Sequence, residues 1–283
     1  KLEKFVRSRF NNLHKGGIFL AVTVLVISTA VPLAILIVCY KVNVVLGVAV
    51  ESIMCWQLVA ARCLQKESMK VYYAIKENDV EKARKSVSMI VGRDTDILDE
   101  TGIIKAAVET VAENTSDGVT APIMYIALGG AALGFFYKAA NTMDSMIGYK
   151  NEKYAEIGRF AARFDDLLNF IPSRLTALAM IFSAYIMRFD GRNSFYIWKR
   201  DRRKHASPNS AQTESVCAGA LDIRLAGDAY YFGELHKKEF IGDDIRSPEN
   251  EDIRRANRLM YCTSVVVLVL SLTFRAFVFG GLL

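Results

Sequence analysis

Long apolar segments constrain the fold of this 283-residue chain more than any other feature. Residues 17–40 form an almost uncharged run of about 24 residues, enough for a helix to cross a bilayer. Further apolar segments cover residues 44–61, 119–139, 171–189 and 259–279. Hydrophobic residues make up 52% of the chain, and its mean hydropathy is +0.20. We therefore predict an all-α, polytopic integral membrane protein, one domain over residues 1–283, with amphipathic cytoplasmic helices and a long polar loop region.

The positive charge of the chain fits a membrane better than a nucleic acid. The net charge is +6, but Lys and Arg lie mainly between the apolar segments, where membrane proteins carry flanking charge. Residues 1–15 are basic and precede the first apolar segment, which places them in the cytoplasm by the positive-inside rule. We expect a lipid bilayer as the surroundings and no nucleic acid as a partner.

Two common kinds of site are missing from the sequence. The five cysteines show no paired short spacing, which argues against a disulfide framework and a zinc site. Neither Gly-x-x-x-x-Gly-Lys-Ser/Thr nor Gly-x-Gly-x-x-Gly occurs, so a nucleotide would have to be held without a P-loop or a Rossmann turn.

Residues 41–99 contain acids with two possible roles each. Glu51 lies inside an apolar segment, where an acid either serves function or pairs with Arg62 near the membrane edge. Residues 66–91 have the spacing of two amphipathic surface helices, with Asn78 and Asp79 as the turn and N-cap between them. Asp94, Asp96 and Asp99 suit helix capping and metal or phosphate chemistry equally well.

Three acids converge in the next segment. Apolar residues recur at helical spacing from Ile103 to Val111, which puts Glu109 and Glu113 together on another face, with Asp117 just beyond the helix. Spacing alone favours a solvated helix face. The polar turn that follows, Asn114-Thr-Ser-Asp-Gly, instead favours a site at the mouth of an apolar segment, where Mg²⁺ would turn the repulsion into attraction.

Four motifs then resemble the CobD/CbiB family of cobalamin biosynthesis. They are Glu113–Pro122, Tyr137–Lys150, Ala162–Arg174 and Ser207–Ser210. The resemblance runs from about Gly16 to the C-terminus. Chains of that family open with an additional apolar helix, whereas this sequence begins at Lys1-Leu-Glu-Lys, so that helix is either outside this sequence or absent from this member.

The resemblance implies a ligase. Its reaction would be the ATP-dependent joining of a corrinoid, adenosylcobyric acid, to (R)-1-amino-2-propanol or its O-2-phosphate, giving adenosylcobinamide or its phosphate. ATP and Mg²⁺ are the implied cofactors, and other membrane enzymes of the cobalamin pathway are implied partners. The implied location is the cell membrane, with the active site facing the cytoplasm.

The residues suggest how the chemistry is divided. Carboxylates hold Mg²⁺ and cationic side chains hold phosphates in phosphoryl transfer. The predicted metal ligands are Glu109, Glu113 and Asp117, with Asp144 as a further candidate. The predicted catalytic residues are Asp144, Asp165 and Asp166, of which Asp165 or Asp166 takes the proton of the attacking ammonium. The predicted substrate and phosphate contacts are Asn114, Thr115, Ser116, Lys138, Asn141, Lys150, Arg163, Arg174, Arg203, His205, Ser207 and Asn209.

Topology and function remain coupled. If all five segments cross the bilayer, residues 140–170 lie on the side opposite the other polar blocks, which would separate Glu113 from Asp144. We therefore expect residues 119–139 to be short, tilted or re-entrant, so that both motifs share one cytoplasmic site. The alternative function is a non-catalytic membrane transporter or sensor, which should carry more charged residues within its spans than Glu51.

Overall fold

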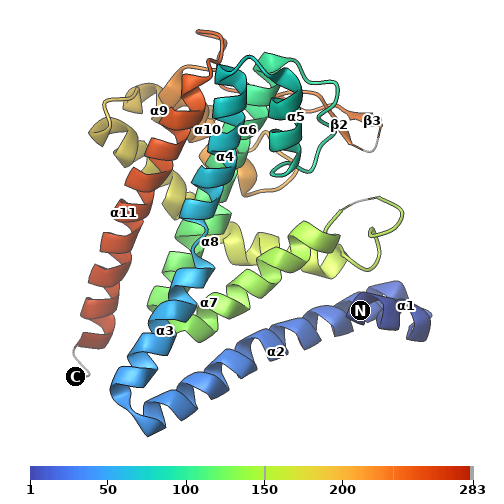
Figure 1. The fold of residues 1–283 in the computed structure, drawn as a ribbon, viewed down its shortest axis with the longest axis vertical. Coiled ribbons are helices and arrows are strands. Elements are labelled where there is room, and N and C mark those ends of the chain that lie inside the picture. The colour runs from blue at the N-terminus through green and yellow to red at the C-terminus, as the bar shows by residue number, and fades with distance from the viewer. Residues whose placement is uncertain (150, 232, 281–283) are drawn as a thin grey trace. The chain divides into compact units, whose positions relative to one another are not determined.

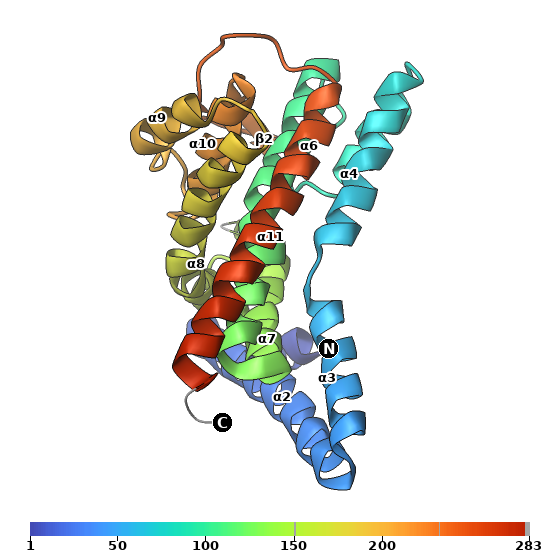
Figure 2. The same ribbon diagram turned by 90° about the vertical axis from the view of Figure 1, so that its left-hand side faces the viewer.

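The computed structural model describes residues 1–149, 151–231 and 233–280, and the chain divides into two compact units. The first comprises Lys1–Val59, Pro122–Asn169 and Ser271–Leu283, and the second comprises Ala60–Ala121 and Phe170–Leu270. Figures 1 and 2 show the ribbon from two directions. A single domain over residues 1–283 stays a prediction.

The first unit consists of helices joined by turns and contains no strand over the residues described. Its elements are α1 (Leu2–Arg9), α2 (Leu13–Val42), α3 (Val44–Leu58), most of α7 (Ala121–Ile147), the first part of α8 (Arg159–Ile186) and the end of α11 (Glu251–Phe279). Asn43 separates α2 from α3, and its side chain accepts hydrogen bonds from the backbone of Val45 and Leu46. This cap produces the tight turn between the two helices that Figure 2 shows.

The second unit combines helices with short strands. Its helices are α4 (Ala61–Lys76), α5 (Val80–Ser88), α6 (Glu100–Asn114), the π-helix η1 (Thr115–Thr120), α9 (Gly191–Asp201), α10 (Ser210–Leu221) and the remaining parts of α8 and α11. Strand β1 (Leu225–Ala226) pairs with β4 (Phe240–Ile241), and β2 (Ala229–Tyr231) with β3 (Glu234–His236), both antiparallel. The polar region is thus more ordered than a loop: α10 lies against α6 and α9, and all its residues are buried.

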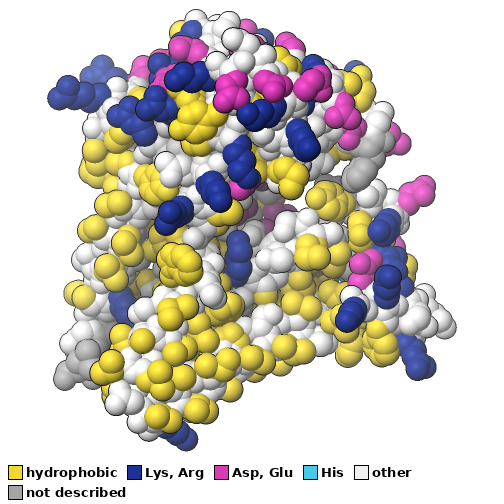
Figure 3. Space-filling view, in the orientation of Figure 1, with side chains coloured by type: hydrophobic (Ala, Val, Ile, Leu, Met, Phe, Trp, Pro, Cys, Tyr) yellow, Lys and Arg dark blue, Asp and Glu magenta, His cyan; other side chains and the backbone are white. Residues whose placement is uncertain are grey.

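Five stretches of helix are long and apolar enough to span a membrane among the residues described. They are Leu13–Val42, Val44–Lys76, Glu100–Ile147, Arg159–Ile186 and Glu251–Val278. Each contains most of one predicted apolar segment, which confirms the all-α membrane fold. In Figure 3 hydrophobic side chains cover much of the surface of α2 and α3. Exposed hydrophobic residues of these helices include Val26, Val38 and Trp56. Such a surface suits lipid better than water.

The predicted turn and caps are also present. Asp79 caps α5 by accepting from the Lys82 backbone at 2.9 Å, and Asn78 takes the left-handed conformation with φ 58°. Asp99 caps α6 through the Gly102 backbone at 2.7 Å. Asp94 instead accepts from the Gly233 backbone at 2.7 Å and so ties the loop before α6 to the β2–β3 hairpin.

The segment expected to be tilted or re-entrant is broken at Gly129–Gly130. Gly130 has φ 64° and ψ −164°, a conformation that favours glycine. Residues eight apart on a straight helix are separated by about 12 Å, yet a Cβ added to Gly134 would lie 2.8 Å from Cγ1 of Ile126. The chain therefore folds back on itself within α7.

Two charged side chains satisfy the backbone at this break. Glu51 of α3 accepts from the Ala131 N–H at 3.2 Å and from the Tyr40 hydroxyl at 2.6 Å. Arg275 of α11 donates to the Ala127 carbonyl at 2.9 Å. A backbone group without a partner costs about 1–3 kcal/mol in apolar surroundings. Glu51 thus faces protein and caps a helix, a role that neither interpretation of the sequence specified.

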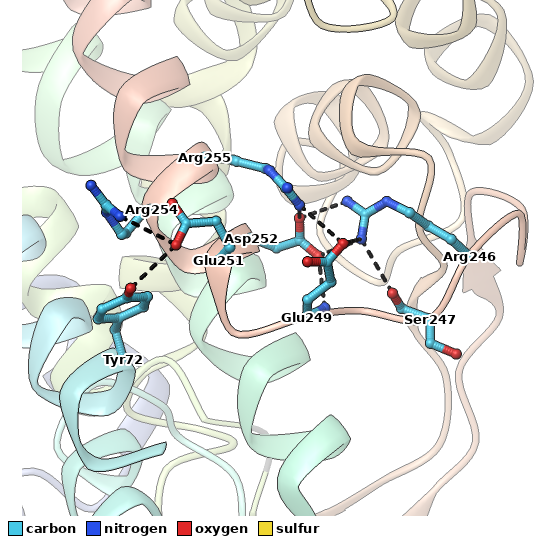
Figure 4. A network of polar contacts seen from close by, with 8 residues as sticks. All are labelled: Tyr72, Arg246, Ser247, Glu249, Glu251, Asp252, Arg254 and Arg255. Carbon is cyan, nitrogen blue, oxygen red and sulfur yellow. Dashed lines mark hydrogen bonds and ion pairs between the residues drawn. The ribbon is translucent and has the colours of Figure 1, made fainter. Parts of the chain in front are cut away.

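Buried acids anchor the polar segments of the second unit. Asp201, at the end of α9, is fully buried, accepts from the Gly242 backbone at 2.8 Å and pairs with Arg200 and Lys204. Burial alone would raise the pKa of Asp201, but these hydrogen bonds lower it to about 2. Figure 4 shows a second anchor, Asp252 at the start of α11, bound by Arg246 and Arg255.

We expect Gly130→Ala to destabilise the protein by about 1–3 kcal/mol from backbone strain alone. The new methyl group would also collide with Oε1 of Glu51 and disturb the cap. The control is Gly233→Ala, which has φ 81° but nothing within 4 Å of an added Cβ. Thermal unfolding in detergent should show a clearly larger loss for Gly130→Ala, and equal losses would contradict the role of Glu51 as a cap.

We expect Asp201→Asn to lower stability at pH 7 by about 2 kcal/mol. The folded pKa lies below the unfolded value of about 3.9, so the charged form stabilises the fold above about pH 4. That contribution is lost as the pH falls toward 2. Denaturant unfolding should therefore show a gap between wild type and variant that closes on acidification, whereas Asp243→Asn, at the exposed partner of Arg200, should show little gap at any pH.

Candidate functional site

Two motifs far apart in sequence meet in the second unit. Glu113, near the end of α6, accepts a hydrogen bond at Oε1 from the hydroxyl of Ser210 at 2.7 Å. Ser210 is the first residue of α10, and both it and Glu109, one turn before Glu113, are buried. The facing surfaces of α6 and α10 therefore bring the motifs Glu113–Pro122 and Ser207–Ser210 together.

The interpretation as a solvated face is wrong for Glu109, whereas Glu113 is partly exposed. Glu109 is only 7% exposed, Oε2 pairs with Arg93, and Oε1 accepts from the Ala226 N–H at 2.7 Å. Burial alone would lower the pKa of Arg93, but the neighbouring Glu109 carboxylate raises it. Helical spacing could not reveal this partner, because Arg93 reaches Glu109 from the loop before α6.

A further acid, the buried Glu214, lies on the same face of α10 as Ser210, one turn later. It is 6% exposed, and its Oε2 has no hydrogen-bond partner among the residues that the structure describes. Burial, followed by the charges of Glu113 and Glu109, raises the pKa of Glu214 well above its ordinary value. We call Glu109, Glu113 and Glu214 the carboxylate cluster.

His205 belongs to the same neighbourhood. Burial lowers the pKa of His205, while the nearby Glu113 opposes that change. The Ser207 N–H donates to Nδ1 of His205 at 3.1 Å, which leaves the proton of the neutral ring on Nε2. His205 therefore offers a neutral donor close to the cluster at neutral pH.

The turn before α10 is held by α8. Ser173 and Arg174 donate to Oδ1 of Asn209 at 3.2 and 3.0 Å, and Arg174 also donates to the Pro208 carbonyl at 3.2 Å. The Asn209 N–H donates to the Ser207 hydroxyl at 3.3 Å. Arg174 and Asn209 thus shape the turn that presents Ser210 to Glu113. Substrate contact by Arg174, Ser207 and Asn209 stays a prediction.

The polar turn after α6 is a π-helix. The Thr115 hydroxyl donates to the Val111 carbonyl at 2.7 Å, and the Asn114 amide to the Thr110 carbonyl at 3.0 Å. Ser116 is buried, and its hydroxyl has no partner within the described part of the chain. Asp117 is partly buried. Single π-helical turns are frequent at functional sites.

Two further motifs meet in the first unit, on α7 and α8. The Tyr137 hydroxyl donates to Oδ1 of Asn169 at 2.7 Å, and the Asn169 amide donates to Asp165 at 3.0 Å. The Asn141 amide approaches the other Asp165 oxygen at 3.4 Å. Asp165 and Asn169 are buried, so the motifs Tyr137–Lys150 and Ala162–Arg174 share one polar chain inside an apolar unit.

The remaining predicted residues are more exposed. Asp144 and Asp166 are partly buried, Arg163 and Arg203 are exposed, and Lys150 lies outside the described residues. Lys138 lines a cavity of about 420 Å³ together with Thr142 and apolar residues of α2 and α7. Because Glu113 and Asp144 belong to different units, their meeting in one site stays a prediction.

Within the described ranges, no group of three or more His, Cys, Asp or Glu side chains is placed to hold a metal ion. Mg²⁺, however, is commonly bound by one or two carboxylates together with substrate phosphates. Since Arg93 neutralises Glu109, Glu113 and Asp117 are the better candidates of the predicted three. The metal assignment stays a prediction.

Three residues of these contacts were not predicted from the sequence: Arg93, Glu214 and Asn169. The sequence pattern could have indicated Glu214 as a site residue, because it follows Ser210 by one helical turn in a segment of small and apolar residues without Lys or Arg. Asn169 lies one turn after Asp165 within a motif already identified. Arg93 gave no such signal, because only the fold brings its loop to Glu109.

The chain is similar in sequence to known proteins of cobalamin biosynthesis. The family model described as CobD/Cbib protein matches residues 1–260. The cobalamin biosynthesis protein CobD of Clostridium perfringens is 46% identical over 97% of this chain and 87% of the relative. That of Pelobacter propionicus is 43% identical over 99% and 86%, and that of Streptococcus sanguinis 50% identical over 75% and 67%. No solved structure matches. The chain, with its four motifs joined pairwise by side-chain hydrogen bonds, belongs to the CobD/CbiB family of cobalamin biosynthesis.

Proposed function

We propose that this protein forms an amide bond between adenosylcobyric acid and (R)-1-amino-2-propanol or its O-2-phosphate, at the expense of ATP. Membership of the CobD/CbiB family supports a role in cobalamin biosynthesis. The product would be adenosylcobinamide or its phosphate. The proposed location is the cell membrane, with the reaction on the cytoplasmic side, and the five apolar helices support the membrane part of this proposal.

The observation that carries the proposal is the contact between Ser210 and Glu113. The hydrogen bond of 2.7 Å joins residues of two family-like motifs that are 97 positions apart in the sequence. It occurs beside two other acids and a histidine whose pKa is lowered by burial. Ionisable residues whose pKa is shifted by burial and by neighbouring charge, as in Glu214 and His205, occur more often at reaction sites than elsewhere. A purely structural contact would not need three acids on two facing helices.

The residues present fit a magnesium nucleotide. Ser210 engages one oxygen of Glu113, whose side chain is partly exposed beside the π-helix that carries Asp117. When bound, ATP with Mg²⁺ would activate the corrinoid carboxylate by phosphoryl transfer. Glu113 and Asp117 would hold the cation. In the second unit, the exposed Arg203 would neutralise phosphate charge. Arg163 and Lys138, in the first unit, stay predicted phosphate contacts.

Proton removal is the other requirement, because the free amine is the nucleophile. Asp165 or Asp166 is the proposed acceptor. Asp165 is held in place by the amides of Asn169 and Asn141, which fix the direction of its oxygens. Other membrane enzymes of the pathway are proposed as partners.

The transporter or sensor alternative has less support. Its best candidate residue, Glu51, caps the backbone at Ala131 and accepts from Tyr40. Both oxygens of Glu51 therefore have partners within the fold, and its presence in an apolar segment does not require an ion or solute path.

We expect purified protein in detergent to consume ATP only when both the corrinoid and the amine are present. Formation of the amide, followed by mass spectrometry, should match ATP consumption one to one. ATP consumption that ignores the corrinoid, or transport activity without any amide product, would contradict the proposed reaction.

We expect Glu113→Gln to reduce ligation by on the order of a hundredfold or more, because it removes one charge from the proposed cation site. The melting temperature should change little, since Gln can still accept from Ser210. Glu234→Gln is the matched control: it removes one exposed acid from β3 and should leave ligation unchanged. Near-normal turnover of Glu113→Gln with unchanged Mg²⁺ dependence would mean that the metal is held elsewhere.

A further inference from the structure

Glu214 is a buried acid that the proposed chemistry has not used. It projects from α10, whose residues are all buried, and is itself 6% exposed. Oε2 of Glu214 receives no hydrogen bond from any described residue. The other two acids of the carboxylate cluster each have a donor, Arg93 and the Ala226 N–H for Glu109 and Ser210 for Glu113. A buried carboxyl oxygen without a donor is costly unless a ligand supplies one.

The charged groups around Glu214 define what that ligand must be. Glu109 and Glu113 face it from α6, and Arg93 and Lys238 are the cations near it. Arg93 is committed to Glu109, and the Lys238 ammonium donates to the Tyr231 hydroxyl at 2.7 Å. On α10 itself the neighbouring ionisable group is Cys217, whose pKa is raised by burial. The cluster therefore attracts a small cation that carries its own N–H or O–H donors.

We infer that Glu214 binds the ammonium group of the amine substrate. This inference rests on the proposed function, because the amine is the substrate named there. A primary ammonium carries one positive charge and three N–H donors, so it can donate to the unpartnered Oε2 of Glu214, and its charge favours the ionised form of that carboxyl. Mg²⁺ is commonly bound by one or two carboxylates together with substrate phosphates, the role already proposed for Glu113 and Asp117, which leaves Glu214 without an assigned ligand.

The position of Glu214 also suits the reaction. It lies one turn after Ser210, and Ser210 contacts Glu113, the proposed cation ligand. An ammonium on Glu214 would therefore be held close to the site at which the corrinoid carboxylate is activated. Glu214 would act as a positioning residue for the nucleophile, and binding close to the activated carboxylate would raise the local concentration of the amine.

Amine binding can be measured without ATP or corrinoid. Titration calorimetry of the full chain in detergent should show that wild type binds 1-amino-2-propanol and that Glu214→Gln binds it at least about tenfold more weakly. 1,2-Propanediol, which replaces the ammonium by a hydroxyl, should bind neither protein measurably. Glu214→Asp keeps the charge and should retain part of the affinity, while Glu234→Gln should bind like wild type.

Two outcomes would overturn the inference. One is equal amine affinity of wild type and Glu214→Gln, including the case in which neither binds. The other is Glu214-dependent binding of Mg²⁺ alone without binding of the amine, which would make this a metal site. Melting temperatures without ligand should show that Glu214→Gln is folded and no less stable than wild type, because it removes an acid from a like-charged group.

Steady-state kinetics separate this inference from the proposed function. In the ligation assay Glu214→Gln should raise the KM for the amine about tenfold or more and leave the KM for the corrinoid unchanged. If wild type ligates and the amine KM does not change in the variant, the inference fails and the function stands. If wild type does not ligate, the function fails, whatever the amine titration shows.

Discussion

The break in α7 depends on one carboxylate inside an apolar unit. At Gly129–Gly130 the helix loses its regular hydrogen bonds, and the Ala131 N–H and the Ala127 carbonyl need other partners. Glu51 supplies the acceptor and Arg275 the donor. Without water, each group left unpaired would cost a sizeable part of a protein's net stability. These two side chains therefore allow the chain to fold back and to present the second half of α7, with Tyr137 and Asn141, to α8.

Buried acids of the second unit also need hydrogen-bond donors, and one buried carboxyl oxygen there has none among the described residues. The buried Glu109 and Asp201 are satisfied by named donors, so their burial is compatible with a stable fold, and the partly exposed Glu113 accepts from Ser210. Glu214 stands apart because Oε2 has no donor among the described residues. A fold that satisfies its other buried acids and leaves one oxygen open gives up stability at that point, as binding sites commonly do. That contrast is the physical reason for assigning Glu214 a ligand.

The family motifs gain a structural meaning from these contacts. Ser210 joins Glu113, Asn209 joins Ser173 and Arg174, and Asp165 joins Asn141 through hydrogen bonds between residues far apart in sequence. The motif Ala162–Arg174 contributes to both units, because Asp165 and Asn169 belong to the first and Ser173 and Arg174 to the second. Several motif residues thus hold other motif residues in place. A match to a family motif therefore does not by itself show whether a residue contacts substrate or supports the fold.

The sequence alone determined the membrane class, the five apolar helices and the local caps at Asp79 and Asp99, because hydrophobic runs and capping residues act over a few neighbouring positions. The expectation that residues 119–139 are not a plain span came from the need to bring Glu113 and Asp144 to one side of the membrane, and the break at Gly129–Gly130 was found only in the structure. Only the tertiary structure decided which acids are paired. Arg93 reaches Glu109 from a loop, Ser210 reaches Glu113 from another helix, and Glu214 has no donor. Burial and pairing depend on segments that the chain brings together over about a hundred residues, and no local periodicity encodes such contacts.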